Sequence, residues 1–101
     1  MKVIADKAEI ALDFPDKAYV GTFGRSAHFD AGADAVGVRL KLERRDDQKR
    51  LVDLHLHHGL FADVLQAIAE SVAGQPPIDP PHRDALIEAT RHLLEALEAQ
   101  A

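Results

Sequence analysis

Residues 50–61 read RLVDLHLHHGLF, and within this segment the chain changes from one kind of structure to another. Up to His57, apolar residues recur at every second position, which is typical of a strand with one buried face. After Gly59 they recur at every third or fourth position, which is typical of an amphipathic helix. The segment also contains three of the six histidines. It therefore indicates where a sheet ends and a helical part begins.

Alternating apolar residues upstream of this segment predict three more strands. The clearest alternation covers about residues 36–44, and weaker alternation covers about residues 8–14 and 17–29. The quoted segment supplies the fourth strand, at about residues 50–58. A Pro-Asp pair at residues 15–16 is expected to turn the first strand back onto the second. The four strands would then pair in chain order as an antiparallel β-meander.

Side-chain parity decides how the last two predicted strands pair. Their apolar residues share one face only if the connecting loop holds an odd number of residues. The register that meets this condition places Leu42 opposite Val52, Lys41 opposite Asp53, and Arg39 opposite His55. It leaves Asp53, His55 and His57 on an outward-facing polar surface. Residues 30–35 have the composition of a loop.

Two amphipathic helices are expected after the sheet. The first covers about residues 60–73, with an apolar stripe formed by Phe61, Val64, Leu65, Ile68 and Val72. The second covers about residues 80–99, because Asp79 followed by Pro80 is a typical helix start. The apolar face of the sheet needs cover, so both helices are expected to pack on it. The chain thus predicts one α+β domain over residues 1–101, a ββββαα two-layer sandwich.

Composition and charge exclude several classes of function. The net charge is −5, which argues against binding to nucleic acid or to an anionic membrane. The chain has no cysteine, which excludes disulfides and thiolate metal sites and fits a reducing compartment. No apolar run is long enough to span a membrane, and the charged beginning of the chain is unlike a signal peptide. A soluble cytoplasmic protein is therefore expected.

The strongest chemical pattern is Asp53-x-His55-x-His57, which places three possible metal ligands on one face of a strand. Imidazole and carboxylate groups at this spacing suit zinc, so these are the predicted metal ligands, with His58 as an extension of the set. The alternative is that they only form the polar face of the sheet, opposite Arg39 and Lys41. No cofactor is predicted apart from zinc.

A second candidate site uses the same end of the strand to bind an anion or a partner. His57 and His58 precede the first predicted helix, whose first N–H groups attract anions. Arg39 would face the same ligand. Arg39, Lys41, His57 and His58 are therefore the predicted contact residues for a ligand or for a protein partner.

The sequence contains no nucleophile elbow, phosphate-binding loop or dinucleotide-binding motif, which favours a function that is not enzymatic. We expect a small binding, adaptor or regulatory domain that acts through the outer face of its sheet. In the predicted meander, residues 51–57 form an edge strand, and pairing of two such edges predicts a homodimer. The alternative is a metal- or anion-binding protein built on Asp53, His55, His57 and His58. Such a protein could act as a hydrolase.

Overall fold

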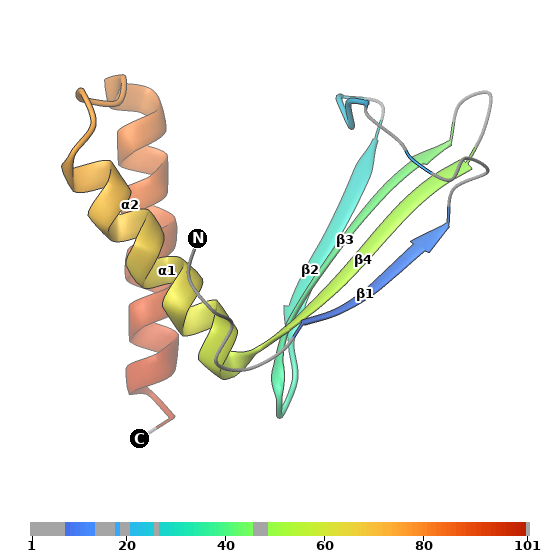
Figure 1. Cartoon of the computed structure of the whole chain (residues 1–101). Helices are drawn as coiled ribbons and strands as arrows, with labels where there is room; N and C mark the ends of the chain where they lie inside the picture. The colour runs from blue at the N-terminus through green and yellow to red at the C-terminus, as the bar shows by residue number, and fades with distance from the viewer. Residues whose placement is uncertain (1–7, 14–17, 19–20, 26, 46–48, 101) are drawn as a thin grey trace. The chain divides into compact units, whose positions relative to one another are not determined.

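The computed structural model describes residues 8–13, 18, 21–25, 27–45 and 49–100. Four strands precede two helices along the chain, as the colours of Figure 1 show. The elements are β1 (Ala8–Asp13), β2 (His28–Ala33), β3 (Gly37–Arg45), β4 (Lys49–His57), α1 (His58–Ala73) and α2 (Pro80–Glu98). This order confirms the predicted α+β class and the change from strand to helix. The chain forms two units, residues 1–70 and 71–101, and the sheet belongs to the first.

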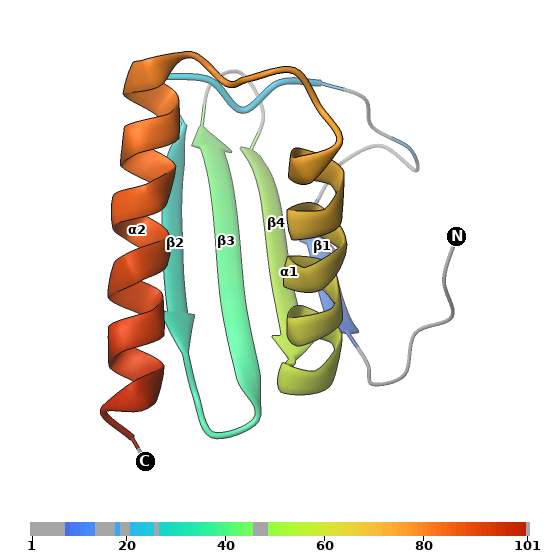
Figure 2. The same ribbon diagram turned by 90° about the vertical axis from the view of Figure 1, so that its left-hand side faces the viewer.

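The strands form one antiparallel sheet in the order β1-β4-β3-β2 (Figure 2). The prediction that the first strand pairs with the second is therefore wrong, and so is the strand order of the meander. All six residues of β1 pair with β4, which makes β4 a central strand. A Pro-Asp pair is not a favoured hairpin turn, whereas β4 offers β1 an apolar partner at every second position.

β2 begins at His28, so the predicted strand at residues 17–29 is wrong for most of the residues that the structure describes. Residues 21–25 contain no strand, and residues 19–20 lie outside the described part. The first four residues of the predicted loop at residues 30–35 are strand. The apolar positions of β2 pair with β3 in the register Phe29–Leu42, Ala31–Leu40 and Ala33–Val38. Pairing with an apolar neighbour thus outweighs local turn composition.

The predicted register of β3 and β4 is confirmed. Leu42 lies opposite Val52, Lys41 lies opposite Asp53, and Arg39 lies opposite His55. The last pair, Arg45 and Lys49, leaves three residues between the strands, which is an odd number as side-chain parity requires. The two strands therefore present their apolar residues to one side and their polar residues to the other.

One face of the sheet is apolar across all four strands. Its three cross-strand rows contain Leu12, Val52, Leu42 and Phe29, then Leu54, Leu40 and Ala31, then Leu56, Val38 and Ala33. Exposure is high on the edge strands, at 59% for Leu12 and 76% for Phe29. An apolar face of this kind favours a covering layer. The packing of both helices on this face stays a prediction.

A side chain closes the turn between β2 and β3. Asp34 Oδ1 accepts hydrogen bonds from the backbone N–H groups of Val36 and Gly37, both at 2.9 Å. Asp side chains favour turns because they satisfy nearby backbone N–H groups in this way. Gly37 is buried opposite His57, where an added Cβ would collide with the Leu56 carbonyl oxygen and lie 2.8 Å from the His57 Cα. This close approach of two backbones explains the glycine.

The helices begin and end close to the predicted positions. α1 begins two residues before the predicted start, and α2 begins at Pro80, as predicted. Asp79 is the N-cap of α2, and its carboxylate accepts a hydrogen bond from the His82 backbone N–H at 3.2 Å. Within the part of the chain that the structure describes, neither helix combines the length and the apolar character needed to cross a bilayer.

We expect Gly37→Ala to destabilise the protein, because the added methyl group would meet backbone atoms of β4. The free energy of unfolding should fall by about 1–3 kcal/mol, which is typical of overpacking. Urea denaturation followed by circular dichroism measures this change. Gly32→Ala is the matched control, since no atom lies within 4 Å of its added Cβ, and it should be neutral or mildly stabilising. Equal losses in both variants would contradict the close approach.

Candidate metal centre on the polar face of the sheet

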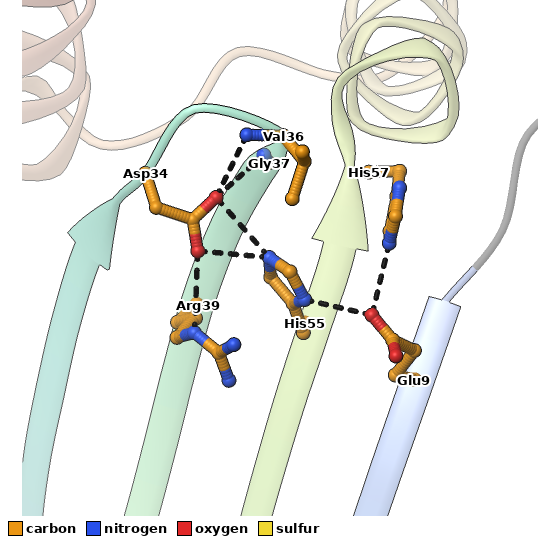
Figure 3. A network of polar contacts seen from close by, with 7 residues as sticks. All are labelled: Glu9, Asp34, Val36, Gly37, Arg39, His55 and His57. Atoms are coloured by element: carbon orange, nitrogen blue, oxygen red, sulfur yellow. Dashed lines mark hydrogen bonds and ion pairs between the residues drawn. The ribbon is translucent and has the colours of Figure 1, made fainter.

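Polar side chains from three strands and one turn gather on the face opposite the apolar rows (Figure 3). Glu9 comes from β1, Arg39 from β3, His55 and His57 from β4, and Asp34 from the turn after β2. The register places Glu9 and Arg39 on either side of His55. His57 shares this face because alternate residues of a strand point the same way. The arrangement therefore follows from the pairing of β4 with two neighbours.

Glu9 joins the two histidines through one carboxylate oxygen. Its Oε1 lies 2.9 Å from Nδ1 of His55 and 2.9 Å from Nε2 of His57. The centroids of the two imidazole rings are 5.0 Å apart. One possible ligand atom from each of the three residues lies within 4.8 Å of the others, so a single ion could contact all three. We call Glu9, His55 and His57 the Glu-His-His cluster.

His55 is held from both sides. While Nδ1 faces Glu9, Nε2 lies 3.1 Å from Oδ2 of Asp34. The residue is only 5% exposed, although its strand position predicts a solvent-facing surface. Polar neighbours thus replace water at both ring nitrogens, which is what a buried polar side chain requires.

Asp34 is a fixed anion behind His55. The Val36 N–H has the largest effect on the Asp34 carboxyl, and together with the Gly37 N–H and His55 it outweighs desolvation and lowers the pKa to about 2. Arg39 Nε lies 3.4 Å from Oδ2 of the same carboxylate. Asp34 is therefore ionised at neutral pH and can only accept hydrogen bonds. It follows that His55 carries a proton on Nε2 and turns Nδ1 toward Glu9.

The contacts at Glu9 leave two chemical choices. Nδ1 of His55 and Nε2 of His57 both face a carboxylate oxygen, and an unprotonated nitrogen would repel it because both atoms are acceptors. Each nitrogen must therefore either carry a proton and donate to Glu9, or share a cation with it. The same three atoms can form a hydrogen-bonded ion pair or a metal site.

The predicted metal ligands are only partly brought together. His55 and His57 lie in the Glu-His-His cluster, but Glu9 supplies the carboxylate nearest to them in place of Asp53. Asp53 precedes His55 by two residues on the same face, and its Oδ1 is buried without a hydrogen-bond partner among the described residues. His58 is the exposed first residue of α1 and does not belong to the cluster.

Two hollows lie on the polar face beside the cluster. The smaller is lined by Glu9, Ala11, Arg39, Asp53 and His55. The larger lies over β2, β3 and β4, and its polar lining consists of Asp30, Asp34, Arg39, Lys41 and Asp53. Arg39 and Lys41, two of the predicted contact residues, thus lie on the same face as the cluster, and Arg39 borders both hollows.

Sequence reasoning missed Glu9 and Asp34 as members of the site. Glu9 reaches the histidines only because β1 pairs with β4, and it lies 46 residues before His55, so no local spacing reveals the contact. Asp34 does have a signal, because an Asp three residues before the start of a strand is typical of a turn closed by its own side chain. That signal predicts the turn but not the contact with His55.

Asp34 should make the protein sensitive to acid in a defined range. Its folded-state pKa of about 2 lies below the ordinary value of 3.8, so its contribution is complete above about pH 4 and is lost as the pH falls toward 2. We expect Asp34→Asn to lower the melting temperature at pH 7, and the difference from the unaltered protein to shrink between pH 4 and pH 2. A difference in melting temperature that stays constant between pH 4 and pH 2 would contradict the lowered pKa of Asp34.

Comparison of the chain with protein-family models, with curated proteins and with solved structures found no match in any of the three. The function must therefore be argued from the side chains of the sheet.

Proposed function

We propose that this protein binds a divalent transition-metal ion, such as Zn²⁺, through Glu9, His55 and His57. The observation that supports this most directly is the convergence of one carboxylate oxygen and two imidazole nitrogens within 4.8 Å. Imidazole and carboxylate are common ligands of Zn²⁺, at about 2.0–2.2 Å. The non-enzymatic binding domain expected from the sequence, acting through its outer sheet face, would then have a specific ligand.

Glu9 would have to move to admit the ion. Two ligand atoms of a tetrahedral zinc ion lie about 3.3 Å apart, whereas Glu9 Oε1 lies 2.9 Å from each imidazole nitrogen. The Glu9 side chain is more than half exposed, and its Oε1 would have to withdraw by roughly 0.4 Å from each nitrogen to reach that spacing. Loss of the two N–H protons then converts the imidazole donors into ligands.

Asp34 supports the proposal from behind the cluster. A histidine that binds a metal through one nitrogen usually donates its other N–H to a carboxylate or a carbonyl. Asp34 stands 3.1 Å from Nε2 of His55 and is itself held by two backbone N–H groups. The His55 ring is therefore oriented before any ion arrives, which reduces the entropy lost on binding.

The donor set indicates the class of metal. Two nitrogen donors and one oxygen donor suit Zn²⁺, Co²⁺, Ni²⁺ and Cu²⁺. Mg²⁺ and Ca²⁺ prefer six or more oxygen ligands, which the Glu-His-His cluster does not provide. We therefore expect Zn²⁺ to bind in the presence of an excess of Mg²⁺.

The homodimer, the protein partner and the cytoplasmic location expected from the sequence stay predictions. A homodimer was predicted because residues 51–57 were expected to form an edge strand, but β4 lies between β1 and β3. The described edge strands are β1 and β2, so we propose that self-association, if it uses a sheet edge, uses one of these two.

The metal proposal is tested by titrating Zn²⁺ into the purified chain, by calorimetry and by thermal melting. A hundredfold excess of Zn²⁺ over its Kd should stabilise the protein by about 2.7 kcal/mol. The His55→Ala/His57→Ala double variant should lose this effect. His82→Ala/His92→Ala is the matched control, since it removes two exposed histidines of α2. This variant should still be stabilised by Zn²⁺. The proposal is wrong if Zn²⁺ does not stabilise the unaltered protein, or if it stabilises both double variants equally.

A second experiment identifies the carboxylate ligand. Glu9→Gln should weaken Zn²⁺ binding by about tenfold or more, because a neutral amide is a poor substitute for a carboxylate ligand. Asp53→Asn removes the same charge two residues from His55 and should leave Zn²⁺ affinity nearly unchanged. Calorimetric Kd values for the two variants measure the difference. The opposite order of effects would favour the ligand set Asp53, His55 and His57 predicted from sequence.

A further inference from the structure

The smaller hollow opens on the side of the Glu-His-His cluster that lies away from His57. Asp53 and His57 stand two residues before and two residues after His55 on one strand face, so they flank it on opposite sides. The hollow is lined by Asp53 and His55 but not by His57. Ala11, opposite Asp53 on β1, has a short side chain that leaves room there. An ion held by the cluster would border this space.

The three protein ligands would leave one coordination position open. Zn²⁺ sites with three protein ligands carry water or an exchangeable ligand in the fourth position. We infer that a metal ion in the cluster binds there a small oxyanion that carries an O–H group, such as dihydrogen phosphate or bicarbonate, between Arg39 and Asp53. This inference rests on the proposed metal site.

Arg39 supplies the donors for the oxyanion. It lies opposite His55 on β3, lines the hollow, and has a side chain that is 55% exposed. Its contact with Asp34 runs through Nε at 3.4 Å, which leaves the two Nη groups directed elsewhere (Figure 3). The planar guanidinium group matches two oxygens of an oxyanion, and such charged hydrogen bonds are among the strong ones.

Asp53 decides which oxyanions fit. Asp53 lines the hollow, while its Oδ1 is buried below the surface without a hydrogen-bond partner among the described residues. An anion without hydrogen, such as nitrate, would only repel the Asp53 carboxylate, whereas an O–H group of dihydrogen phosphate or bicarbonate can donate to it.

The charges around the hollow are compatible with a singly charged ligand. With a divalent ion bound, the charges of the ion and Arg39 cancel those of Glu9, Asp34 and Asp53. Lys41 lies directly opposite Asp53 on β3 and contributes one further positive charge. A monoanion at the open position would bring this group of residues to neutrality.

The test uses the full chain loaded with Co²⁺, whose visible absorption reports changes in its ligands. Inorganic phosphate should change the spectrum, and nitrate should need at least about tenfold higher concentrations for the same change, since the lost hydrogen bond and the repulsion by Asp53 each weaken it. Asp53→Asn should reduce the difference between the phosphate and nitrate concentrations that give the same spectral change. Arg39→Gln, measured at saturating Co²⁺, should weaken phosphate binding by about tenfold.

Arg83→Gln is the matched control for the loss of a cation. Arg83 lies on α2, and its side chain is 54% exposed, close to the value for Arg39. This variant should bind phosphate as the unaltered protein does. Circular dichroism of each variant confirms that it is folded before the titration.

The outcomes separate the two proposals. If Co²⁺ binds equally to the unaltered protein and to His55→Ala/His57→Ala, the proposed metal site is wrong. The oxyanion inference is then wrong as well, because it rests on that site. If Co²⁺ binds to the cluster but phosphate leaves the spectrum unchanged, the metal site stands and the oxyanion inference is overturned. Equal responses to phosphate and nitrate, or equal effects of Arg39→Gln and Arg83→Gln, would also overturn it.

Discussion

The alternation of β4, with a neighbouring strand on each side, is the constraint on which the rest of the sheet depends. Val52, Leu54 and Leu56 point to one face, so the residues of β1 and β3 that pair with them must be apolar as well. A slip of one residue in either pairing would place leucines beside carboxylates. The register is therefore specified from both sides of one strand, and the clean separation of the two faces is its result.

The same constraint gathers the polar groups and makes them depend on one another. Burial of an imidazole is unfavourable unless its nitrogens find partners, and His55 finds one on each side, in Glu9 and in Asp34. Asp34 in turn depends on the turn that follows β2, because the N–H groups of that turn hold its charge in place. The polar face is thus a connected network, which a simple solvent-facing surface does not need.

Local patterns predict local structure here, and they fail where the structure depends on distant pairing. Periodicity predicts β3, β4 and both helices to within two residues of their observed ends, and parity predicts the β3–β4 register. The position of β1 depends on which strand competes best for it, and no spacing within residues 8–14 reveals that choice. Two ligands of the candidate site, His55 and His57, share a strand and were predictable. Glu9 was not predictable, because it lies beside the histidines only when β1 pairs with β4.

The attachment of β1 has a consequence for the whole N-terminal edge. Among the described strands, β1 is joined to the sheet through β4 alone, and Glu9 is its residue in the cluster. An ion bound there would link positions 46 residues apart, as a disulfide does in other proteins, in a chain without cysteine. Fraying of this edge would then require release of the ion. Metal supply would set how long β1 resists proteases.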